Sequence, residues 1–356
     1  MPDWKRSMQQ TFEFYTVDPN TWGDKDRIRN INGCSISRDS TAETLGSATI
    51  DFIEIPNECY VRIYLITVQN GVTEKHPLAT VLVQTPMTDF DGKVKKASVD
   101  AYTPLMELKE NPPPLGFSLF KDDNIMDKTY KLTQENLRAP VVGVECSKTL
   151  NEDWVADPNE KWLSYLISLM SNANYSYALD EMGRILFSPD QDTASLQPVW
   201  TYDDGNSSIL YPEISLDHDL FDIPNVIEVV YTDDAHEYKA RVVNDDPNSP
   251  ISTVNRGREI THRETNPTIV SGGDGGATQQ MVDDYAKKLL RDKSSVEYTL
   301  SYKHAYCGTR LGDCVRLNYE RAGIKDVKAK IISQTINCTP GCPVTEKAVF
   351  TTKLWG

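Results

Sequence analysis

The last quarter of the sequence, residues 278–355, changes its hydrophobic period once, and this change limits what the chain can fold into. Over 279–292 the apolar residues recur at the spacing of one helix face, and Thr278 stands where a helix cap is expected. Over 296–302 apolar and polar residues alternate, which is typical of a half-buried strand. Three further strand-like runs follow, separated by turns that contain glycine. The pattern predicts a helix at about 279–292 and then a four-stranded antiparallel meander.

The first third of the chain, from about residue 11 to residue 102, has the pattern of an all-β region. About six strand-like runs are present, and Asn-Gly at 70–71 and Asp-Gly at 91–92 are strong signals for hairpin turns. Residues 59–69 are apolar on both faces, as in a strand that is covered on both sides. We therefore expect residues 1–109 to form a small tube-like antiparallel β-barrel.

The middle of the chain has a different pattern. Three consecutive prolines within residues 110–116 exclude a helix there and predict a stiff linker. A poorly periodic stretch extends to about residue 157, and a buried helix at 160–172 and a hairpin turning at 181–183 are predicted after it. A helix followed by a hairpin indicates that residues 110–215 hold a linker and a small α+β domain.

Residues 216–356 are expected to form a second tube-like β-barrel, which contains the predicted helix. Its first strand is expected at 223–231. The glycine-rich run at 271–277 is expected to be a flexible loop. A phosphate-binding role is not expected, because no Gly-Lys-Ser/Thr follows the run. The predicted fold class is therefore mainly β with an α+β insert, consisting of two tube-like antiparallel β-barrels and a small α+β middle domain.

The chain carries a net charge of −15, and the excess of acidic residues lies in one segment. Residues 145–246 contain 21 acidic and 5 basic side chains. A sequence this acidic is a poor candidate for binding nucleic acid, which needs clustered Lys and Arg. No apolar run approaches the roughly 18 residues of a membrane span. The N-terminal residues also lack the apolar core of a signal peptide. We expect no membrane anchor and assembly in the cytoplasm.

Several groups of residues have the composition of a chemical site but no distinctive spacing. Three carboxylates and an imidazole that could bind a metal occur close together: Asp217, His218, Asp219 and Asp222. The apolar residues between them favour an acidic loop at the edge of a core instead. Pairs of carboxylates that could hydrolyse a glycan occur in turn-like contexts: Asp203/Asp204, Asp233/Asp234 and Asp245/Asp246. His304 lies three residues before Cys307, but a packed or surface histidine is favoured over a catalytic Cys-His pair. We therefore predict no catalytic residue, no metal ligand and no cofactor.

The chain has seven cysteines, four of them in the C-terminal strands. These four form a candidate disulfide or thiol cluster: Cys307, Cys314, Cys338 and Cys342. Zinc ligands usually come in pairs with two to four residues between them, and only Cys338 and Cys342 have this spacing. Reduced thiols, a disulfide within or between subunits, and zinc all stay open, with zinc the least favoured. The other three cysteines are expected to be small buried hydrophobes: Cys34, Cys59 and Cys146.

Several residues of the last quarter follow one another in an order that is informative as a whole. They are Leu311, Gly312, Asp313, Val315, Leu317, Gly323, Val327 and the closing Lys353, Leu354 and Trp355. With the preceding helix and tyrosine-rich strand, this order resembles the C-terminal barrel of phage tail baseplate hub proteins. That family belongs to contractile tails and is related to the hub part of type VI secretion spikes. The order of the earlier regions matches the same family, so the resemblance extends over nearly the whole chain.

The resemblance implies a structural protein without enzymatic activity. It implies a homotrimer whose six barrels form a ring that adapts a hexameric tail tube to a trimeric central spike, while DNA passes through without specific binding. Expected partners are further copies of the chain, the tail tube protein, the central spike protein, baseplate wedge or tail-tip proteins, and a tape measure protein. We expect the protein in the virion tail, at the baseplate, after assembly in the host cytoplasm. Spike and enzymatic domains are expected on other chains.

Two other functions stay open at this point. One is a cell-wall glycan hydrolase that uses an acidic pair in residues 145–246, and the other is a tail protein that binds a carbohydrate receptor through Trp and Tyr. Loss of a measured hydrolysis after alanine replacement of one carboxylate pair would favour the hydrolase. Binding of the isolated monomer to a glycan array would favour the receptor-binding protein.

Overall fold

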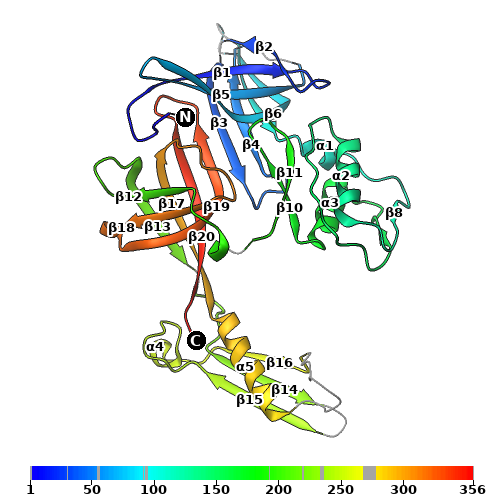
Figure 1. The fold of residues 1–356 in the computed structure, drawn as a ribbon, viewed down its shortest axis with the longest axis vertical. Helices are drawn as coiled ribbons and strands as arrows, with labels where there is room; N and C mark the ends of the chain where they lie inside the picture. The colour runs from blue at the N-terminus through cyan, green and yellow to red at the C-terminus, as the bar shows by residue number, and fades with distance from the viewer. Residues whose placement is uncertain are drawn as a thin grey trace. The chain divides into compact units, whose positions relative to one another are not determined.

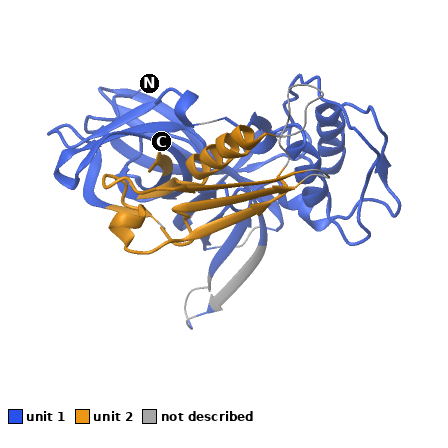
Figure 2. Cartoon of the chain, turned by 90° about the horizontal axis from the view of Figure 1, so that it is seen from below, with its two compact units in different colours: residues 1–214, 301–348 blue, residues 215–300, 349–356 orange. Residues whose placement is uncertain are grey.

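The computed structural model describes residues 2–29, 31–53, 57–90, 92, 95–191, 193–218, 220–232, 236–267 and 278–355. The protein is mainly β with few helices, which confirms the predicted fold class (Figure 1). Among the described residues, thirteen strands form one hydrogen-bonded sheet. The chain divides into two compact units, coloured separately in Figure 2: a first unit, Met1–Ile214 with Ser301–Ala348, and a second unit, Ser215–Leu300 with Val349–Gly356. None of the described helices is long and apolar enough to cross a membrane.

The N-terminal part of the first unit consists of antiparallel strands. They are β1 (Gln9–Val17), β2 (Asp24–Ile28), β3 (Ile31–Asp39), β4 (Gly46–Phe52), β5 (Cys59–Gln69), β6 (Val72–Phe90) and β7 (Lys95–Tyr102), in the sheet order β3-β4-β7-β6-β5-β1-β2. As predicted, β5 is buried on both faces, and it meets β6 at the Asn-Gly turn. Asp91 of the second turn signal lies outside the described residues. The sequence predicts about six strands because β2 lacks apolar alternation and is an exposed, charged edge.

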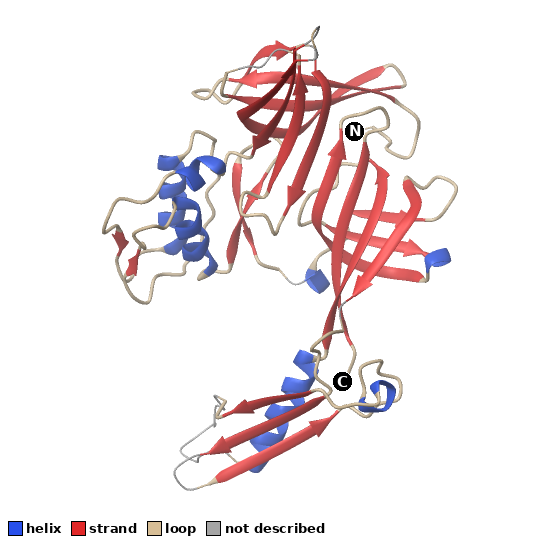
Figure 3. Cartoon of the chain, turned by 180° about the vertical axis from the view of Figure 1, so that it is seen from behind, coloured by secondary structure: helices blue, strands red, loops and turns tan. Residues whose placement is uncertain are grey.

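The middle segment supplies the helices of the first unit. Its elements are α1 (Met106–Glu110), β8 (Ser118–Leu119), α2 (Ile125–Asn136), β9 (Trp154–Val155), α3 (Trp162–Ser171), β10 (Tyr175–Leu179), β11 (Ile185–Pro189) and the 3-10 helix η1 (Thr193–Ser195). The predicted buried helix and hairpin are confirmed as α3 and β10–β11. In Figure 3, α1, α2 and α3 form one group, and their apolar side chains share a core with the hairpin.

Helix α2 falls in the stretch that the sequence analysis describes as poorly periodic. Two of its buried positions are threonines, so the apolar period is incomplete. The Thr129 hydroxyl donates to the Ile125 carbonyl at 2.8 Å, and the Thr133 hydroxyl lies 2.7 Å from the Tyr177 hydroxyl. Because these internal hydrogen bonds satisfy the hydroxyl groups, the threonines can replace apolar residues on a buried helix face.

The remaining strands of the large sheet are β12 (Trp200–Asp203), β13 (Leu210–His218), β17 (Ser295–Ala305), β18 (Cys314–Tyr319), β19 (Ile324–Asn337) and β20 (Pro343–Lys353), with the 3-10 helix η2 (Glu320–Ala322) before β19. The predicted meander order is wrong. β17 pairs with β20, while β18 pairs with β19 and, in parallel, with β12. Residues 306–313 between β17 and β18 are a longer connection than hairpins usually have, whereas the later strands are joined by short turns.

The strands that the sequence analysis assigns to two barrels meet where β3 pairs with β19, a contact that we call the seam. Ser35 pairs with Asn337, and the register continues to Asp39 opposite Ser333. The Ser35 hydroxyl also donates to the Asn337 side-chain oxygen at 3.3 Å. Apolar side chains from both groups of strands share one core beside the seam. Residues far apart in the sequence are therefore joined by both hydrogen bonds and packing.

The second unit contains β14 (Val226–Thr232), β15 (Glu237–Val243), α4 (Thr253–Arg256), β16 (Thr261–Thr265) and α5 (Gln279–Lys293). α5 packs its apolar face on the sheet β15-β14-β16 through Val282, Ala286 and Leu290 (Figure 2). The strand expected at 223–231 is β14, and it lies in this sheet and outside the large one. The glycine-rich run 271–277 falls outside the described residues. The domain boundaries at 109/110 and 215/216 stay predictions.

Candidate functional site

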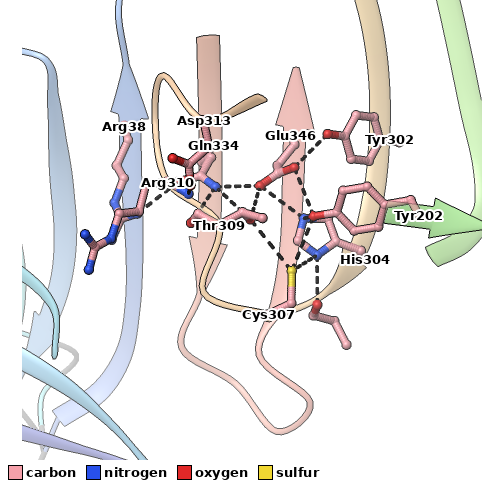
Figure 4. Close-up of polar contacts among 11 residues, drawn as sticks. Arg38, Tyr202, Tyr302, His304, Cys307, Thr309, Arg310, Asp313, Gln334 and Glu346 are labelled. Carbon is pink, nitrogen blue, oxygen red and sulfur yellow. Dashed lines mark hydrogen bonds and ion pairs between the residues drawn. The ribbon is translucent and has the colours of Figure 1, made fainter. Parts of the chain in front are cut away.

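The first unit contains a cluster of buried polar side chains centred on His304 of β17 and Glu346 of β20 (Figure 4). Both side chains are 0% exposed, and His304 Nε2 lies 3.2 Å from Glu346 Oε1. Alternation along the strands places both of them inward, His304 two residues after buried Tyr302 and Glu346 between buried Val344 and Ala348. Two ionisable groups therefore occupy positions that the strand pattern reserves for the core.

Four uncharged side chains donate hydrogen bonds to the Glu346 carboxylate. The hydroxyls of Tyr302 and Tyr202 donate to Oε2 at 2.8 and 3.3 Å. The Thr309 hydroxyl donates to Oε1 at 2.7 Å, and the Gln334 amide donates to the same oxygen. Burial raises the pKa of both tyrosines well above the usual value, so they stay protonated donors. Both carboxylate oxygens thus have their charge compensated by hydrogen bonds.

His304 and Glu346 form an ion pair at neutral pH. His304 Nδ1 lies 2.8 Å from the Ala305 carbonyl oxygen, so both ring nitrogens face acceptors, as an imidazolium requires. Burial lowers the pKa of His304, but the charge of Glu346 and hydrogen bonds outweigh burial and raise it to about 10. Burial raises the pKa of Glu346. The charge of His304 and the hydrogen bonds that Glu346 accepts outweigh burial and lower that pKa below the usual value.

Cys307 adds a thiol to this group, but none of these side chains is open to a substrate. Its Sγ lies 3.9 Å from His304 Nδ1 and 3.8 Å from Thr309 Oγ1. Cys307 is only 7% exposed, and His304 and Glu346 are fully buried. A general base must come within hydrogen-bond reach of its substrate. The arrangement therefore suits a packed histidine, and its contacts hold β12, β17, β19 and β20 together.

The tip of the β10–β11 hairpin contacts both groups of strands in the first unit, and we call this contact the hairpin junction. Glu181 Oε1 lies 2.8 Å from Arg310 Nε and 3.6 Å from Arg38 Nη2, and the glutamate is only 8% exposed. The Met182 carbonyl accepts a hydrogen bond from Trp22 Nε1 at 2.7 Å. One hairpin turn thus binds N-terminal and C-terminal segments at once.

A continuous chain of polar contacts joins the buried cluster to the hairpin junction. Arg38 Nη1 donates to Gln334 Oε1 at 3.0 Å, and the Gln334 amide donates to Glu346. Arg38 also faces Glu181 across the junction, as described above. These residues are not recognisable as a group from the sequence. The available signal is a polar residue at an inward position of an alternating strand, as for Gln334 and Glu346.

The predicted cysteine cluster contains several separate thiol environments. All seven cysteines are free thiols. Cys307 belongs to the buried polar cluster, and the Cys314 thiol donates to the Val315 carbonyl at 3.9 Å. The Cys338 backbone amide donates to the carbonyl of Cys34 at 2.9 Å, and Cys34 is expected from the sequence to be only a buried hydrophobe. The role of the four predicted cysteines as one cluster stays a prediction.

Within the part of the chain that the structure describes, no three His, Cys, Asp or Glu side chains are grouped closely enough to hold a metal ion. His218 stacks on Tyr298, with ring centroids 4.9 Å apart, and Asp219 lies outside the described residues. Of the aspartate pairs, Asp203 accepts the Gly205 amide at 3.0 Å. Asp246 similarly accepts the Asn248 amide at 2.8 Å, and Asp233 and Asp234 lie outside the described residues. Asp203 and Asp246 therefore stabilise turns.

No family model and no curated protein sequence matches this chain. Solved structures do match it. The tail protein from Neisseria meningitidis MC58 aligns with a TM-score of 0.62 at 12% identity, covering 98% of this chain and 98% of that one. The 43 kDa tail protein of prophage MuSo2 from Shewanella oneidensis aligns with a TM-score of 0.62 at 12% identity, covering 95% and 98%.

A third match is a type VI secretion system component from E. coli, which exhibits structural similarity to the T4 bacteriophage tail proteins gp27 and gp5. Its TM-score is 0.51 at 9% identity, and the alignment covers 92% of this chain and 75% of that one. At such identities the likeness establishes a shared fold. The chain is thus similar to phage tail proteins and to a type VI secretion component over nearly its full length, which confirms the predicted resemblance at the level of the fold.

Proposed function

We propose that this protein is a structural hub of a phage or phage-like tail, in which three copies form a ring that adapts a hexameric tail tube to a trimeric central spike. The observation that carries the proposal is the near-complete, mutual coverage of the alignment with the Neisseria tail protein, at 98% of each chain. A match of this extent includes both the large sheet and the second unit. The alignment therefore spans nearly all of both chains and goes beyond a common β motif.

The contacts of the first unit support a structural role. The seam, the buried ion pair and the hairpin junction join segments from both ends of the sequence into one body. Packed cores of this kind transmit strain instead of yielding locally. The buried His304, Cys307 and Glu346 have no exposed route for a substrate, and this supports a protein without enzymatic activity.

We place one contact between subunits at β13. This strand ends the path of paired strands in the described sheet, and most of its residues are exposed. Tyr211 and Leu216 add large apolar side chains to that edge, and Leu216 is 43% exposed. A long, exposed, partly apolar edge strand is a template for pairing with another chain. Affinity would come from backbone hydrogen bonds and buried apolar area.

The partners that follow are the tail tube protein, the central spike protein, baseplate wedge or tail-tip proteins and a tape measure protein. The location that follows is the baseplate of a virion tail, most simply a contractile one, after assembly in the host cytoplasm. The 21 acidic and 5 basic side chains of residues 145–246 would let DNA pass without specific binding.

The mass of the native protein in solution tests this proposal. One chain has a mass of 40.1 kDa, so a trimer has three times 40.1 kDa, close to 120 kDa. We expect a 120 kDa species in light scattering and a ring with pseudo-sixfold symmetry in electron micrographs of the same sample. A protein that remains monomeric at every concentration, or that forms a dimer, overturns the trimeric hub.

A further inference from the structure

Two cysteines from opposite ends of the chain face each other at the end of the seam. Asn337 of β19 pairs with Ser35 of β3, so the next antiparallel positions are Cys338 and Cys34. The Cys338 amide donates to the Cys34 carbonyl at 2.9 Å, which shows that the register continues through this pair. Residues directly opposite in an antiparallel pair project to the same side of the sheet. Both side chains reach the same apolar core.

The geometry of this pair fits a disulfide. Hydrogen-bonded antiparallel partners have Cα atoms about 5.5 Å apart. Disulfides span Cα separations of about 4.4–6.8 Å, with about 5.5–6 Å the most common. The Cα separation expected for Cys34 and Cys338 therefore lies within the range that a disulfide spans. A hydrogen bond with Cys34, together with burial, raises the pKa of the Cys338 thiol.

We propose that Cys34 and Cys338 are a redox site, oxidised by a low-molecular-weight disulfide to an intramolecular disulfide that closes the seam. The thiolate of half-buried Cys338 attacks the small disulfide and releases one thiol, which leaves a mixed disulfide on the protein. The Cys34 sulfur then attacks that mixed disulfide and releases the second thiol. Two protein thiols and one small disulfide thus become one protein disulfide and two small thiols.

The bond would connect the two groups of strands at a point where they otherwise meet through hydrogen bonds and packing. The segment between the two cysteines contains most of the chain, and the stabilisation by a crosslink grows with the length of the closed loop. Reduced thiols suit folding in a reducing cytoplasm, and the bond forms when the finished protein meets oxidising surroundings. This inference does not depend on the proposed hub function.

Cys342 is the competitor that a test must separate from Cys34. It is fully buried, and burial and the nearby Cys338 raise its pKa. Trypsin cleaves after Lys and Arg, which places Cys34 in the fragment 30–38 and both Cys338 and Cys342 in the fragment 331–347. A Cys338–Cys342 bond therefore closes a single peptide, whereas a bond to Cys34 links two peptides.

The experiment is to incubate the native protein with oxidised glutathione, block the remaining thiols in denaturant, and analyse tryptic peptides without reduction. We expect fragments 30–38 and 331–347 as one linked species, with fragment ions that place the bond at Cys338. The linked species should form faster as the pH rises, because the thiolate of Cys338 is the attacking form. A closed 331–347 peptide, a glutathione adduct alone, or no change overturns the proposal.

Serine variants supply the controls. Cys34→Ser and Cys338→Ser should each abolish the linked species, whereas Cys342→Ser should retain it. Cys314→Ser, at a thiol that contacts only a backbone carbonyl in the hydrogen bonds described, is the matched control and should leave the link unchanged. Oxidation should raise the Tm of the wild-type protein by several degrees and leave that of Cys34→Ser unchanged. Linkage that survives in Cys338→Ser assigns the bond to Cys342 and refutes the inference.

Discussion

Replacing Glu346 with glutamine removes the negative charge of the buried ion pair and keeps nearly the same side-chain shape. At neutral pH the variant removes the counterion that keeps the buried His304 protonated, so the ring becomes neutral and the stabilisation from the ion pair is lost. Breaking a buried ion pair from one side costs about 3–5 kcal/mol in the free energy of unfolding. We therefore expect Glu346→Gln to fold with a stability lower by about this amount near neutral pH.

The pH dependence of this loss has a definite sign. The pKa of His304 is about 10 in the folded protein, against a value of 6.5 for an unperturbed histidine. Because the pKa of His304 is higher in the folded state, its proton stabilises the folded protein. This stabilisation is fully present below pH 6.5 and disappears as the pH rises through 10. Between these values the folded state holds one more proton, and stability falls by about 1.4 kcal/mol per pH unit.

The variant should lack this slope. Without the carboxylate, burial keeps His304 neutral in the folded state above its ordinary pKa, so no proton is released on unfolding. The difference in unfolding free energy between wild type and Glu346→Gln should therefore shrink by about 2.7 kcal/mol between about pH 7.5 and about pH 9.5. The other titrating groups are the same in both proteins, and their contributions cancel in the difference.

Urea unfolding followed by tryptophan fluorescence at several pH values measures this difference. All tryptophans except Trp355 lie in the first unit, so the signal reports mainly on the unit that contains the ion pair. Glu152→Gln, at an exposed carboxylate in the same unit, is the matched control and should follow the wild type at every pH. A wild-type-to-variant difference that stays constant with pH would refute the assignment of His304 as an imidazolium.

Two further variants test the hairpin junction and the subunit contact. Gly183→Ala should be less stable than Gly116→Ala by about 1–3 kcal/mol, because both glycines have φ +74° but only at Gly183 would a Cβ meet Thr80, at 2.7 Å from its Cβ. Equal losses in urea unfolding would contradict that reasoning. Leu216→Glu should weaken trimer formation about tenfold or more while Val254→Glu, at a side chain that is 61% exposed, leaves it unchanged. Light scattering across a dilution series measures trimer formation by the two variants. Equal weakening by Leu216→Glu and Val254→Glu would show that β13 is not part of the subunit interface.

Elements carried by apolar residues were predictable from the sequence. The apolar period of α3 and the alternation of β17 gave the correct type and place. Elements that place polar residues on a buried face were not predictable, as Thr129 and Thr133 of α2 show. The buried polar cluster was missed for the same reason, because the pattern assigns inward strand positions to apolar side chains.

Local order along the chain therefore determined much by itself: a mainly β protein, the positions of most strands, the polarity of α5 and the resemblance to tail proteins. Only the tertiary structure decided which strands are neighbours. The pairing of β17 with β20, the seam between β3 and β19 and the contact of Cys34 with Cys338 all join distant segments. A strand's period records which face is buried, and it carries no information about the partner. That choice depends on the packing of the whole sheet and on the charges that have to be paired once they are buried.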